Sequence, residues 1–393
     1  MTNVNEESLS LHKKHQGKLT VTPVFTIKNR KDLALAYTPG VAAVSSLIAE
    51  NKDSSYDYTW RGRVVAVVSD GSAVLGLGNI GPEAALPVME GKSMLMKGFA
   101  NVDSVPLVIN TQDVDEIIKF VKNVAPSFAG INLEDISAPR CFEVEDALQN
   151  IGIPVFHDDQ HGTAIVVRAA LLNAAKVVGK KYSDLKVVVI GAGAAGIAVS
   201  KMLLGISGNG TKYEILPNVE KVRDLILVDT RGAVFPGRDF MNPYKETIAK
   251  YSNKSNKKGS SLGIVEGADV IIGLSGPNLI SAEMIAKMSD KPIVFAMANP
   301  TPEIMPEDAK KAGAFIVATG RSDFDNQINN VLAFPGVFRA VIDGRLKRIT
   351  MEMCIAASNA IASLVKEPAV NNIIPDPFLP DLAKKVSEAI LKI

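Results

Sequence analysis

Short apolar runs rich in Val and Ile alternate with helix-length segments along most of the chain, and this alternation limits the folds open to it. Runs that are apolar throughout are typical of strands buried on both faces, as in parallel sheets covered by helices. Nine runs have strand length: Arg63–Ser69, Pro106–Asn110, Gly130–Leu133, Ile153–Phe156, Lys186–Ile190, Leu225–Val228, Asp269–Leu274, Ile293–Ala296 and Ala314–Ala318. Helical patterns occupy Asp113–Val124, Cys141–Gln149, Thr163–Val178, Met351–Val365 and Leu379–Leu391. We therefore predict an α/β fold with mostly parallel sheets.

The chain has 393 residues, a length that suggests two or three domains at about 150 residues per domain. The helical pattern Thr163–Val178 separates an acidic segment ending at Gln160 from a new strand–helix–strand unit that begins at Lys186. We expect one domain at residues 1–158, joined by the helical segment 331–393. We expect a Rossmann-type domain at residues 159–330, with the functional site in the cleft between the two domains.

The composition excludes several classes of protein. Hydrophobic residues make up 47% of the chain and charged residues 22%, which indicates a globular protein and excludes disorder and a coiled coil. Lys and Arg number 43 against 42 Asp and Glu, for a net charge of +1. Because this balance provides no basic surface, we expect neither nucleic acid nor a membrane as a partner.

Cysteine usage and hydropathy point to a reducing, aqueous compartment. Cys141 and Cys354 are the only cysteines and form no C-x-x-C pair, so we expect neither a disulfide framework nor a thiolate zinc site. Residues 1–18 lack the apolar region of a signal peptide. Arg168 and Lys176 interrupt the best apolar stretch, so we expect no membrane-spanning helix and a cytoplasmic location.

The motif Gly191-Ala192-Gly193-Ala194-Ala195-Gly196 directly follows the strand candidate Lys186–Ile190 and opens a helix of small residues. This context is typical of dinucleotide binding: the first glycine makes a tight turn, the second admits the pyrophosphate, and the third allows close helix packing. Asp229 ends the next strand candidate and would accept hydrogen bonds from the adenosine ribose hydroxyls. Asp229 lies further on than the usual ~20 residues, and we interpret Ser207–Arg223 as a loop insertion.

The choice between NAD and NADP depends on charge at the end of that strand. A carboxylate at Asp229 repels a 2′-phosphate and favours NAD, whereas Arg231, two residues later, provides a partner for the phosphate. We expect NAD, with NADP as the alternative.

A second glycine motif, Gly76-Leu-Gly78-Asn-Ile-Gly81, has a different context. Only a short apolar run precedes it, and the next strand candidate ends in Asn110 rather than in an acid. We interpret this motif as a turn or hinge that leads into the helix carrying Lys92.

Two acidic segments follow neighbouring strand candidates, Glu134-Asp135 and His157-Asp158-Asp159-Gln160. In a parallel sheet both segments would emerge at the carboxyl edge, where their carboxylates would repel unless a cation or a shared proton relieved them. Oxygen donors without thiols favour Mg²⁺ or Mn²⁺. The alternative is that these acids cap helices or lie in solvated loops. We interpret His157 and His161 as packing or hydrogen-bonding residues rather than ligands.

Seven segments occur in the order found in malic enzymes, and the chain resembles the short bacterial form of that family from about Val21 to Val365. They are Tyr37-Thr-Pro-Gly40, Glu90-Gly-Lys92, Glu134-Asp135, Asp158-Asp-Gln-His-Gly-Thr163, Gly191–Gly196, Asn299-Pro-Thr301 and Asn329-Asn-Val-Leu-Ala-Phe-Pro-Gly336. The resemblance implies oxidative decarboxylation of (S)-malate to pyruvate and CO₂, with a divalent metal and NAD(P). It also implies a homodimer or homotetramer, and it makes residues 1–158, with the segment 331–393, the substrate- and metal-binding domain.

The resemblance assigns roles to single residues. The metal ligands would be Glu134, Asp135 and Asp159. The catalytic residues would be Lys92 as the base, Tyr37 as the acid and Asp158 as the residue that supports the lysine. The substrate would contact Lys92, Asn299 and Asn330, and the cofactor would contact Gly191, Gly193, Ala194, Ala195, Gly196, Asp229 and Asn299. Lys92 would take the C2 hydroxyl proton as hydride leaves for the nicotinamide, so its pKa, ~10.4 in a free lysine, must fall. After loss of CO₂, which the metal assists as a Lewis acid, Tyr37 would protonate C3 of enolpyruvate.

Two other functions stay open at this point. A malolactic enzyme would use the same residues with retained NAD and release lactate, although such enzymes resemble the longer form of the family. A catalytically silent dinucleotide-binding regulator would lack Lys92, Tyr37 or a carboxylate ligand, and all of them are present. One departure is that Asp70-Gly71 is followed by Ser72-Ala73, where larger relatives carry a substrate-binding arginine.

Overall fold

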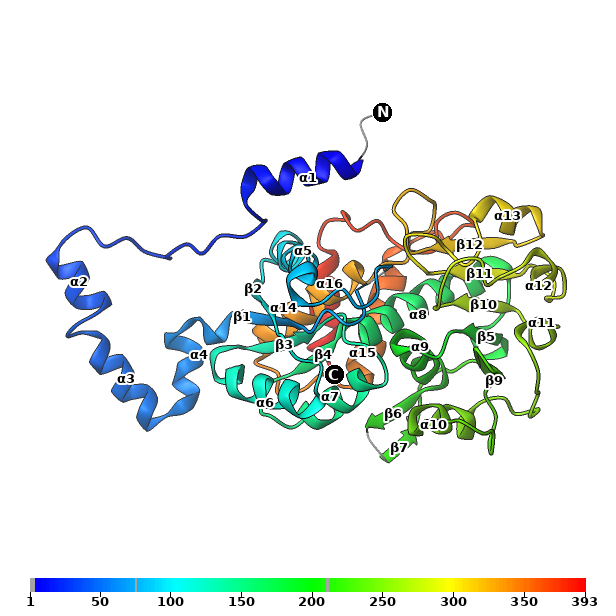
Figure 1. Cartoon of the computed structure of the whole chain (residues 1–393), viewed down its shortest axis with the longest axis horizontal. Helices are drawn as coiled ribbons and strands as arrows, with labels where there is room; N and C mark the ends of the chain where they lie inside the picture. The colour runs from blue at the N-terminus through cyan, green and yellow to red at the C-terminus, as the bar shows by residue number, and fades with distance from the viewer. Residues whose placement is uncertain (1–3, 75, 210–211) are drawn as a thin grey trace.

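The computed structural model describes residues 4–74, 76–209 and 212–393, which form two sheets connected by a long central helix (Figure 1). The first sheet has the order β2-β1-β3-β4, and all of its pairs are parallel. Its strands are β1 (Val64–Ser69), β2 (Asp103–Val108), β3 (Gly130–Leu133) and β4 (Val155–His157). Every residue of β1 is buried, as expected for a strand covered on both faces. The helices that follow its strands are α5 (Pro82–Ala100), α6 (Val114–Val124) and α7 (Arg140–Leu148).

The second sheet has the order β12-β11-β10-β5-β8-β9 and is parallel except for the short strand β9 (Gly232–Ala233). Its other strands are β5 (Lys186–Ile190), β8 (Asp224–Asp229), β10 (Val270–Gly273), β11 (Ile293–Ala296) and β12 (Ile316–Thr319). The chain passes from β5 to β8 on one side and later returns to β10 on the other. The strand order therefore reverses at β5, where open α/β sheets bind ligands beyond the carboxyl ends of the strands.

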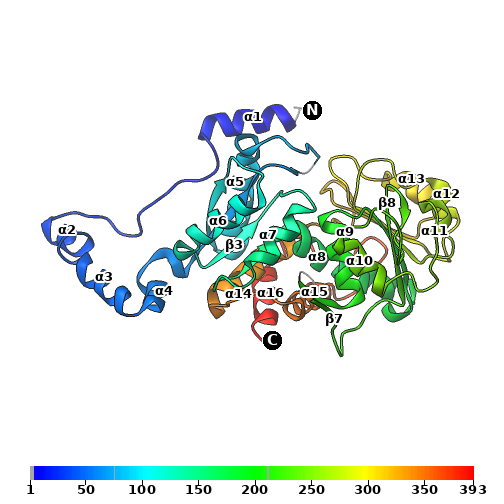
Figure 2. The same cartoon turned by 60° about the horizontal axis from the view of Figure 1, so that its bottom comes forward.

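Helices cover this second sheet on both faces, and a small hairpin projects beside it (Figures 1 and 2). The helices are α9 (Ala194–Leu204), α10 (Pro243–Tyr251), α11 (Ser261–Ile264), α12 (Ala282–Ala286) and α13 (Pro306–Lys311). The hairpin consists of β6 (Ile206–Asn209) and β7 (Lys212–Ile215), which pair in antiparallel fashion. The prediction of a plain loop insertion at Ser207–Arg223 is wrong in this part, because the mixed polar sequence gave no clear strand alternation.

The central helix α8 (Asp158–Val178) carries the chain from the first sheet to the second, and most of its residues are buried. The C-terminal helices pack back onto the first half: α14 (Phe334–Gly344) against α5, α15 (Met351–Leu364) against α8, and α16 (Leu382–Ile390) against both α14 and α15. Polar contacts fix this packing, because Asn173 Nδ2 on α8 donates to the carbonyls of Ala362 and Ile373 at 2.9 and 3.0 Å.

All nine predicted strands are present, and so are the five predicted helices, with ends shifted by a few residues. The largest shift is at α8, which begins at Asp158 rather than at Thr163. Two acids in the first turn favour a helix start through the helix dipole. Gly162 is in turn required there, since a Cβ on it would lie 1.8 Å from Oδ1 of Asp158.

Residues 4–60 form an N-terminal arm that extends away from the two sheets (Figures 1 and 2). It contains α1 (Val4–His15), α2 (Arg30–Ala36), α3 (Val41–Glu50) and α4 (Ser55–Tyr58). The first three of these helices have no buried residue. Lys18, just after α1, anchors the arm to α5: its N–H donates to Glu90 Oε2 at 3.0 Å, and its Nζ donates to the Pro87 carbonyl at 2.8 Å.

Two segments have the length and hydropathy of a membrane-spanning helix. One is α8, whose burial identifies it as the core helix of the fold. The other, Arg30–Glu50, lies on the N-terminal arm, and its helix is interrupted between Ala36 and Val41.

Candidate active site

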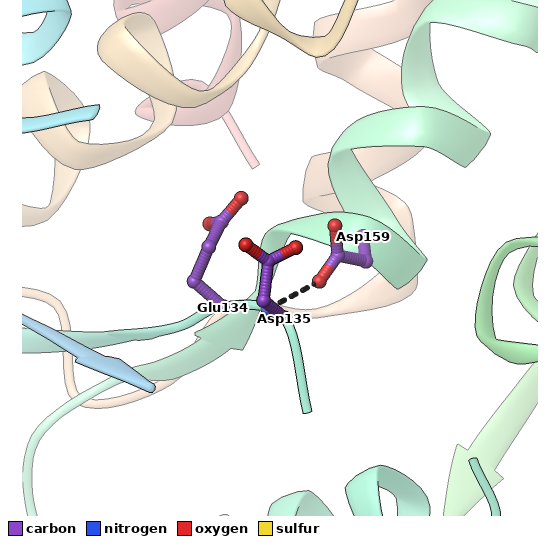
Figure 3. Close-up of side chains that lie close together, drawn as sticks. All are labelled: Glu134, Asp135 and Asp159. Atoms are coloured by element: carbon purple, nitrogen blue, oxygen red, sulfur yellow. Dashed lines mark hydrogen bonds between the residues drawn. The ribbon is translucent and has the colours of Figure 1, made fainter. Parts of the chain in front are cut away.

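Three carboxylates meet at the carboxyl edge of the first sheet (Figure 3). Glu134 and Asp135 directly follow β3, and Asp159 lies in the first turn of α8, directly after the neighbouring strand β4. One oxygen from each carboxylate lies within 4.8 Å of those of the other two. The N–H of Asp135 donates to Oδ2 of Asp159 at 2.8 Å, which fixes the two segments to each other. The sequence prediction that these acids converge is therefore confirmed.

Lys92 projects from α5 into this cluster. Its Nζ lies 2.8 Å from Glu134 Oε1 and 2.5 Å from Asp158 Oδ2, and its side chain is only 7% exposed. The ring of Phe334, from α14, lies 4.2 Å from the same Nζ. Burial by itself lowers the pKa of Lys92, but the nearby carboxylates outweigh burial and hold the pKa well above its usual range. Lys92 is thus an ammonium here, whereas a base needs the opposite shift.

Burial and mutual repulsion disfavour the ionised forms of the clustered carboxylates. Burial, followed by the charge of Asp159, raises the pKa of Asp135 to about 7. Burial also raises the pKa of Glu134 well above its usual range, although Lys92 opposes this shift. Oδ2 of Asp135 and Oδ1 of Asp158 are buried without a hydrogen-bond partner. Unsatisfied buried carboxylate oxygens fit a site that a hard divalent cation completes.

A polar network behind the cluster orients Asp159. His157 Nε2 lies 3.0 Å from Asp159 Oδ2, and the amide nitrogen of Gln160 lies 2.9 Å from His157 Nδ1. Glu145, from α7, accepts from the His157 N–H at 3.0 Å and from Gln160 at 2.9 Å, and His161 lies 2.9 Å from it. The two histidines are hydrogen-bonding residues, as expected. Sequence reasoning missed Glu145, because one acid on a helix carries no signal.

Asn330 and Asn299 lie against different segments of the first half of the fold. Asn330 begins η5 (Asn330–Leu332) and packs over the first turn of α8, since a Cβ on Gly162 would lie 3.2 Å from Asn330 Cβ. Asn299 follows β11, and a Cβ on Gly76 would lie 2.8 Å from its carbonyl oxygen. Gly76 and Asn299 share a cavity of about 600 Å³. The Gly76 loop thus contacts the second sheet's loops and leads through Gly81 into α5, which carries Lys92, as expected for a turn before that helix.

The glycine loop after β5 has the conformation that the motif predicts. Gly191 has φ +117°, and a Cβ there would lie 2.5 Å from the Leu274 carbonyl oxygen. A Cβ on Gly196 would lie 1.8 Å from the Gly191 carbonyl oxygen, so this residue permits close helix packing. A Cβ on Gly193 would contact nothing within 4 Å. The open side of Gly193, with α9 beginning at Ala194, leaves room for a pyrophosphate at a helix N-terminus.

Asp229 ends β8, as predicted, but its carboxylate is already occupied. Arg238 donates to both oxygens, at 2.8 and 2.6 Å, and Lys245 Nζ donates to Oδ2 at 2.6 Å. The Arg231 N–H donates to Oδ1 at 2.9 Å. Burial opposes ionisation of Asp229, but these donors outweigh it and hold the pKa of the carboxyl far below its usual range. Sequence reasoning missed Arg238 and Lys245, which lie on no motif.

Tyr37 is the predicted residue that the single chain does not bring to the cluster. It ends α2 on the N-terminal arm and is 67% exposed. Both views show α2 well apart from α5 and α8 (Figures 1 and 2). Within the described residues, no hydrogen bond, ion pair or ring contact joins a tyrosine to Lys92 or to the three clustered carboxylates.

Comparison with known proteins identifies two family models in sequence. Residues 16–149 match the model of the malic enzyme N-terminal domain, and residues 160–393 match that of the malic enzyme NAD-binding domain.

Full-length relatives and solved structures agree with these models. The chain is 52% identical to the bifunctional malic/malolactic enzyme of Bacillus subtilis, over 99% of this chain and 92% of that protein. It is 49% identical to the NAD-dependent malic enzyme of Geobacillus stearothermophilus, over 100% of this chain and 79% of that protein. The crystal structure of the NAD-dependent malic enzyme from Thermotoga maritima superposes with a TM-score of 0.91 at 46% identity, covering 98% of each chain. Other relatives include NADP-dependent malic enzymes.

Proposed function

The chain belongs to the malic enzyme family, an NAD- or NADP-dependent group of oxidoreductases with small-molecule substrates, and from this premise we propose how its own residues carry out the reaction. The reaction is oxidative decarboxylation of (S)-malate to pyruvate and CO₂. The observation that carries the proposal is the position of Lys92, whose Nζ bridges Glu134 and Asp158 in a buried carboxylate cluster. A catalytically silent regulator is not supported, because Lys92, Glu134 and Asp158 are all present in the cluster.

Glu134, Asp135 and Asp159 are the proposed ligands of Mg²⁺ or Mn²⁺. Three close carboxylates with an unpartnered buried oxygen on Asp135 are suited to a hard cation with oxygen ligands. When bound, such a cation acts as a Lewis acid that acidifies the C2 hydroxyl of malate and stabilises the enolate oxygen after decarboxylation. His157 holds Asp159 in place from behind, as expected for a residue that orients a metal ligand.

Lys92 removes the proton of the C2 hydroxyl in this proposal. It must first release its own proton, and Asp158, at 2.5 Å, is the nearest acceptor. Asp158 is therefore the group that supports the lysine, and Phe334 closes one side of the ammonium against water. Asn330, above the first turn of α8, is suited to hydrogen-bond a substrate carboxylate, and Asn299 to do so from the cofactor side. The loop Gly191–Gly196 would hold NAD⁺ or NADP⁺, which would supply the hydride acceptor for C2 of malate.

Tyr37 protonates C3 of enolpyruvate, and the proposal requires that it come from a second copy of the chain. The N-terminal arm carries a run of exposed apolar side chains without a core of its own: Val21, Val24, Phe25, Ile27, Leu33, Leu35 and Leu47. A continuous exposed apolar surface of this kind is typical of a protein–protein interface. In a twofold dimer the arm of each copy can lie on the other copy, which supplies Tyr37 across the interface.

We further propose that residues 1–158 and 331–393 form the substrate domain and residues 159–330 the cofactor domain. The packing of α14 against α5 supports the first assignment. The two family models meet between residues 149 and 160, near the same boundary, although the second model runs to residue 393. Cys141 and Cys354 are both free and buried, which suits the reducing cytoplasm.

The direct test is an assay of the purified protein with malate, Mn²⁺ and either NAD⁺ or NADP⁺. Equal amounts of reduced cofactor and pyruvate are the expected result. Lactate formed without net reduction would instead establish malolactic activity, which the name of the Bacillus subtilis relative makes worth measuring. Folded protein that forms neither product with either cofactor would contradict the proposed function.

A further inference from the structure

The carboxylate of Asp229 has no acceptor position left for a ribose hydroxyl. A carboxylate offers about four lone-pair positions. Here four donors use them: two nitrogens of Arg238, the Nζ of Lys245 and the N–H of Arg231. An acid at the end of this strand selects NAD when it accepts from the ribose hydroxyls and repels a 2′-phosphate. Asp229 cannot accept a hydrogen bond from a ribose hydroxyl without losing one of its present donors.

The net charge of the residues around Asp229 is also opposite in sign to that of a free carboxylate. Asp229, Arg238 and Lys245 are 7%, 8% and 19% exposed in their side chains, so their charges are little screened by water. Together they sum to one positive charge, and Arg231 adds a second. The Arg231 guanidinium stacks 3.9 Å from the Phe240 ring and makes no ion pair within the described part of the chain. It is an exposed, partly oriented cation beside the end of β8.

We propose that Arg231 and Lys245 form a binding site for the 2′-phosphate of NADP⁺, and that this protein binds NADP⁺ more tightly than NAD⁺. Asp229 serves in it as the anchor of Arg238 and Lys245. The proposal reverses the preference for NAD that Asp229 alone suggested, and it rests on the proposed function, since it places the dinucleotide at the loop Gly191–Gly196. An arginine suits the phosphate because its planar donors match phosphate oxygens in pairs.

The experiment uses two adenosine nucleotides, adenosine 2′,5′-bisphosphate and 5′-AMP, and measures their dissociation constants by calorimetry on the full-length protein. The bisphosphate should bind about 10-fold more tightly, a preference that weakens as salt rises. Arg231→Ala and Lys245→Ala should each remove most of this preference and leave 5′-AMP binding within about twofold. Lys250→Ala, an exposed lysine on the same helix as Lys245, is the matched control and should change neither constant. Melting temperatures of all variants show whether they are folded.

The outcomes separate this inference from the function on which it rests. Equal binding of the two nucleotides, or weaker binding of the bisphosphate, would overturn the 2′-phosphate site while leaving the dinucleotide site intact. Failure of both nucleotides to bind folded protein would contradict the dinucleotide site itself and with it both proposals. In steady state, the ratio of KM for NADP⁺ to KM for NAD⁺ should rise about 10-fold in Lys245→Ala, and an unchanged ratio would overturn the role of Lys245.

Discussion

The Nζ atom of Lys92 lies 2.5 Å from Oδ2 of Asp158, although the two residues are 66 positions apart and belong to different helices. Asp158 is completely buried and Lys92 nearly so, which makes their contact the best-shielded ion pair at the carboxyl edge of the first sheet. A buried pair of this kind is costly to desolvate and contributes little to stability for its cost. Its retention is more readily explained by chemistry, since it holds a proton donor and a proton acceptor in contact beside the carboxylate cluster.

Replacing Lys92 should therefore remove activity more than any other single change on α5. We expect Lys92→Ala to lower kcat by at least about 100-fold, because a positioned general base contributes roughly 10²–10⁴ in rate. Nucleotide binding, measured by calorimetry, should stay within about twofold, since the glycine loop follows β5 of the second sheet and Lys92 lies beside the first sheet. Lys97→Ala, an exposed lysine on the same helix, is the control and should keep nearly full activity. Comparable losses in both variants would indicate damage to α5 rather than loss of a base.

The carboxylate cluster should make the protein's stability respond to divalent cations. Mn²⁺ binds the folded state and not the unfolded chain, so about 100 times its dissociation constant should add about 2.7 kcal/mol and raise the melting temperature by several degrees. Asp135→Asn should abolish most of this rise, because it removes a ligand charge and the unpartnered buried oxygen. Asp323→Asn, an exposed acid elsewhere, should show the full rise. A melting temperature of the native protein that does not change when Mn²⁺ is added would argue against a metal site here.

Most of the fold could be predicted from the sequence, because the buried parallel strands carry a local signal. Gly130–Leu133, Lys186–Ile190 and Ile293–Ala296 occur with the bounds predicted, since each is a short apolar run with a polar residue or turn at its end. In the hairpin at residues 206–215, strand β7 has no buried residue, so no buried face imposes a pattern on it, and the hairpin was missed.

The candidate active site also has residues whose positions the sequence predicts and residues whose positions it does not. Glu134, Asp135 and Asp159 follow strands directly, so a parallel sheet brings them together without further information. Arg238 and Lys245 reach Asp229 only through the path of the chain after β9, which no local pattern specifies. In the proposed dimer, the location of Tyr37 depends on contacts with the second copy, which no pattern within one chain specifies.

Asp269 allows a pH-dependent prediction far from the active site. Burial opposes its ionisation, but Lys180 at 2.6 Å, Ser289 at 2.6 Å and the Lys186 N–H at 2.8 Å outweigh burial and lower its pKa. A carboxyl with a lowered folded-state pKa stabilises the fold above its unfolded pKa of ~3.9, and this stability is lost as pH falls through the folded-state pKa.

We expect Asp269→Asn to lower the free energy of unfolding by about 2 kcal/mol at pH 7, as for hydrogen bonds to a charged group. The difference should shrink below about pH 4, where Asp269 of the unfolded chain begins to take up a proton that the folded state still excludes. Urea unfolding between pH 7 and pH 3.5 measures both effects. Asp290→Asn, at an exposed neighbouring position, is the control. A difference that stays constant with pH would mean that lost packing, not lost charge, explains the effect.

The proposed exchange of Tyr37 between two copies makes a prediction that no single-chain site can satisfy. Lys92→Ala and Tyr37→Phe should each be inactive alone, because one lacks the base and the other the acid. In a dimer of one copy of each, one site combines both substitutions, whereas the other combines an intact Lys92 with an intact Tyr37 from the opposite copy. Mixing the two variants under conditions that let dimers exchange should therefore restore up to about a quarter of native activity, since about half of the dimers are mixed.

If each Tyr37 instead served the Lys92 of its own chain, every site in every dimer would carry one defect, and mixing would restore nothing. A mixture of Lys92→Ala with itself after the same treatment is the negative control, and light scattering shows whether dimers form at all. Restored activity should also depend on the arm: Leu35→Asp, which puts a charge on its exposed apolar surface, should weaken the dimer and lower the recovery. Native protein that is active while it scatters as a monomer would rule out the exchange, because Tyr37 would then reach Lys92 without a partner.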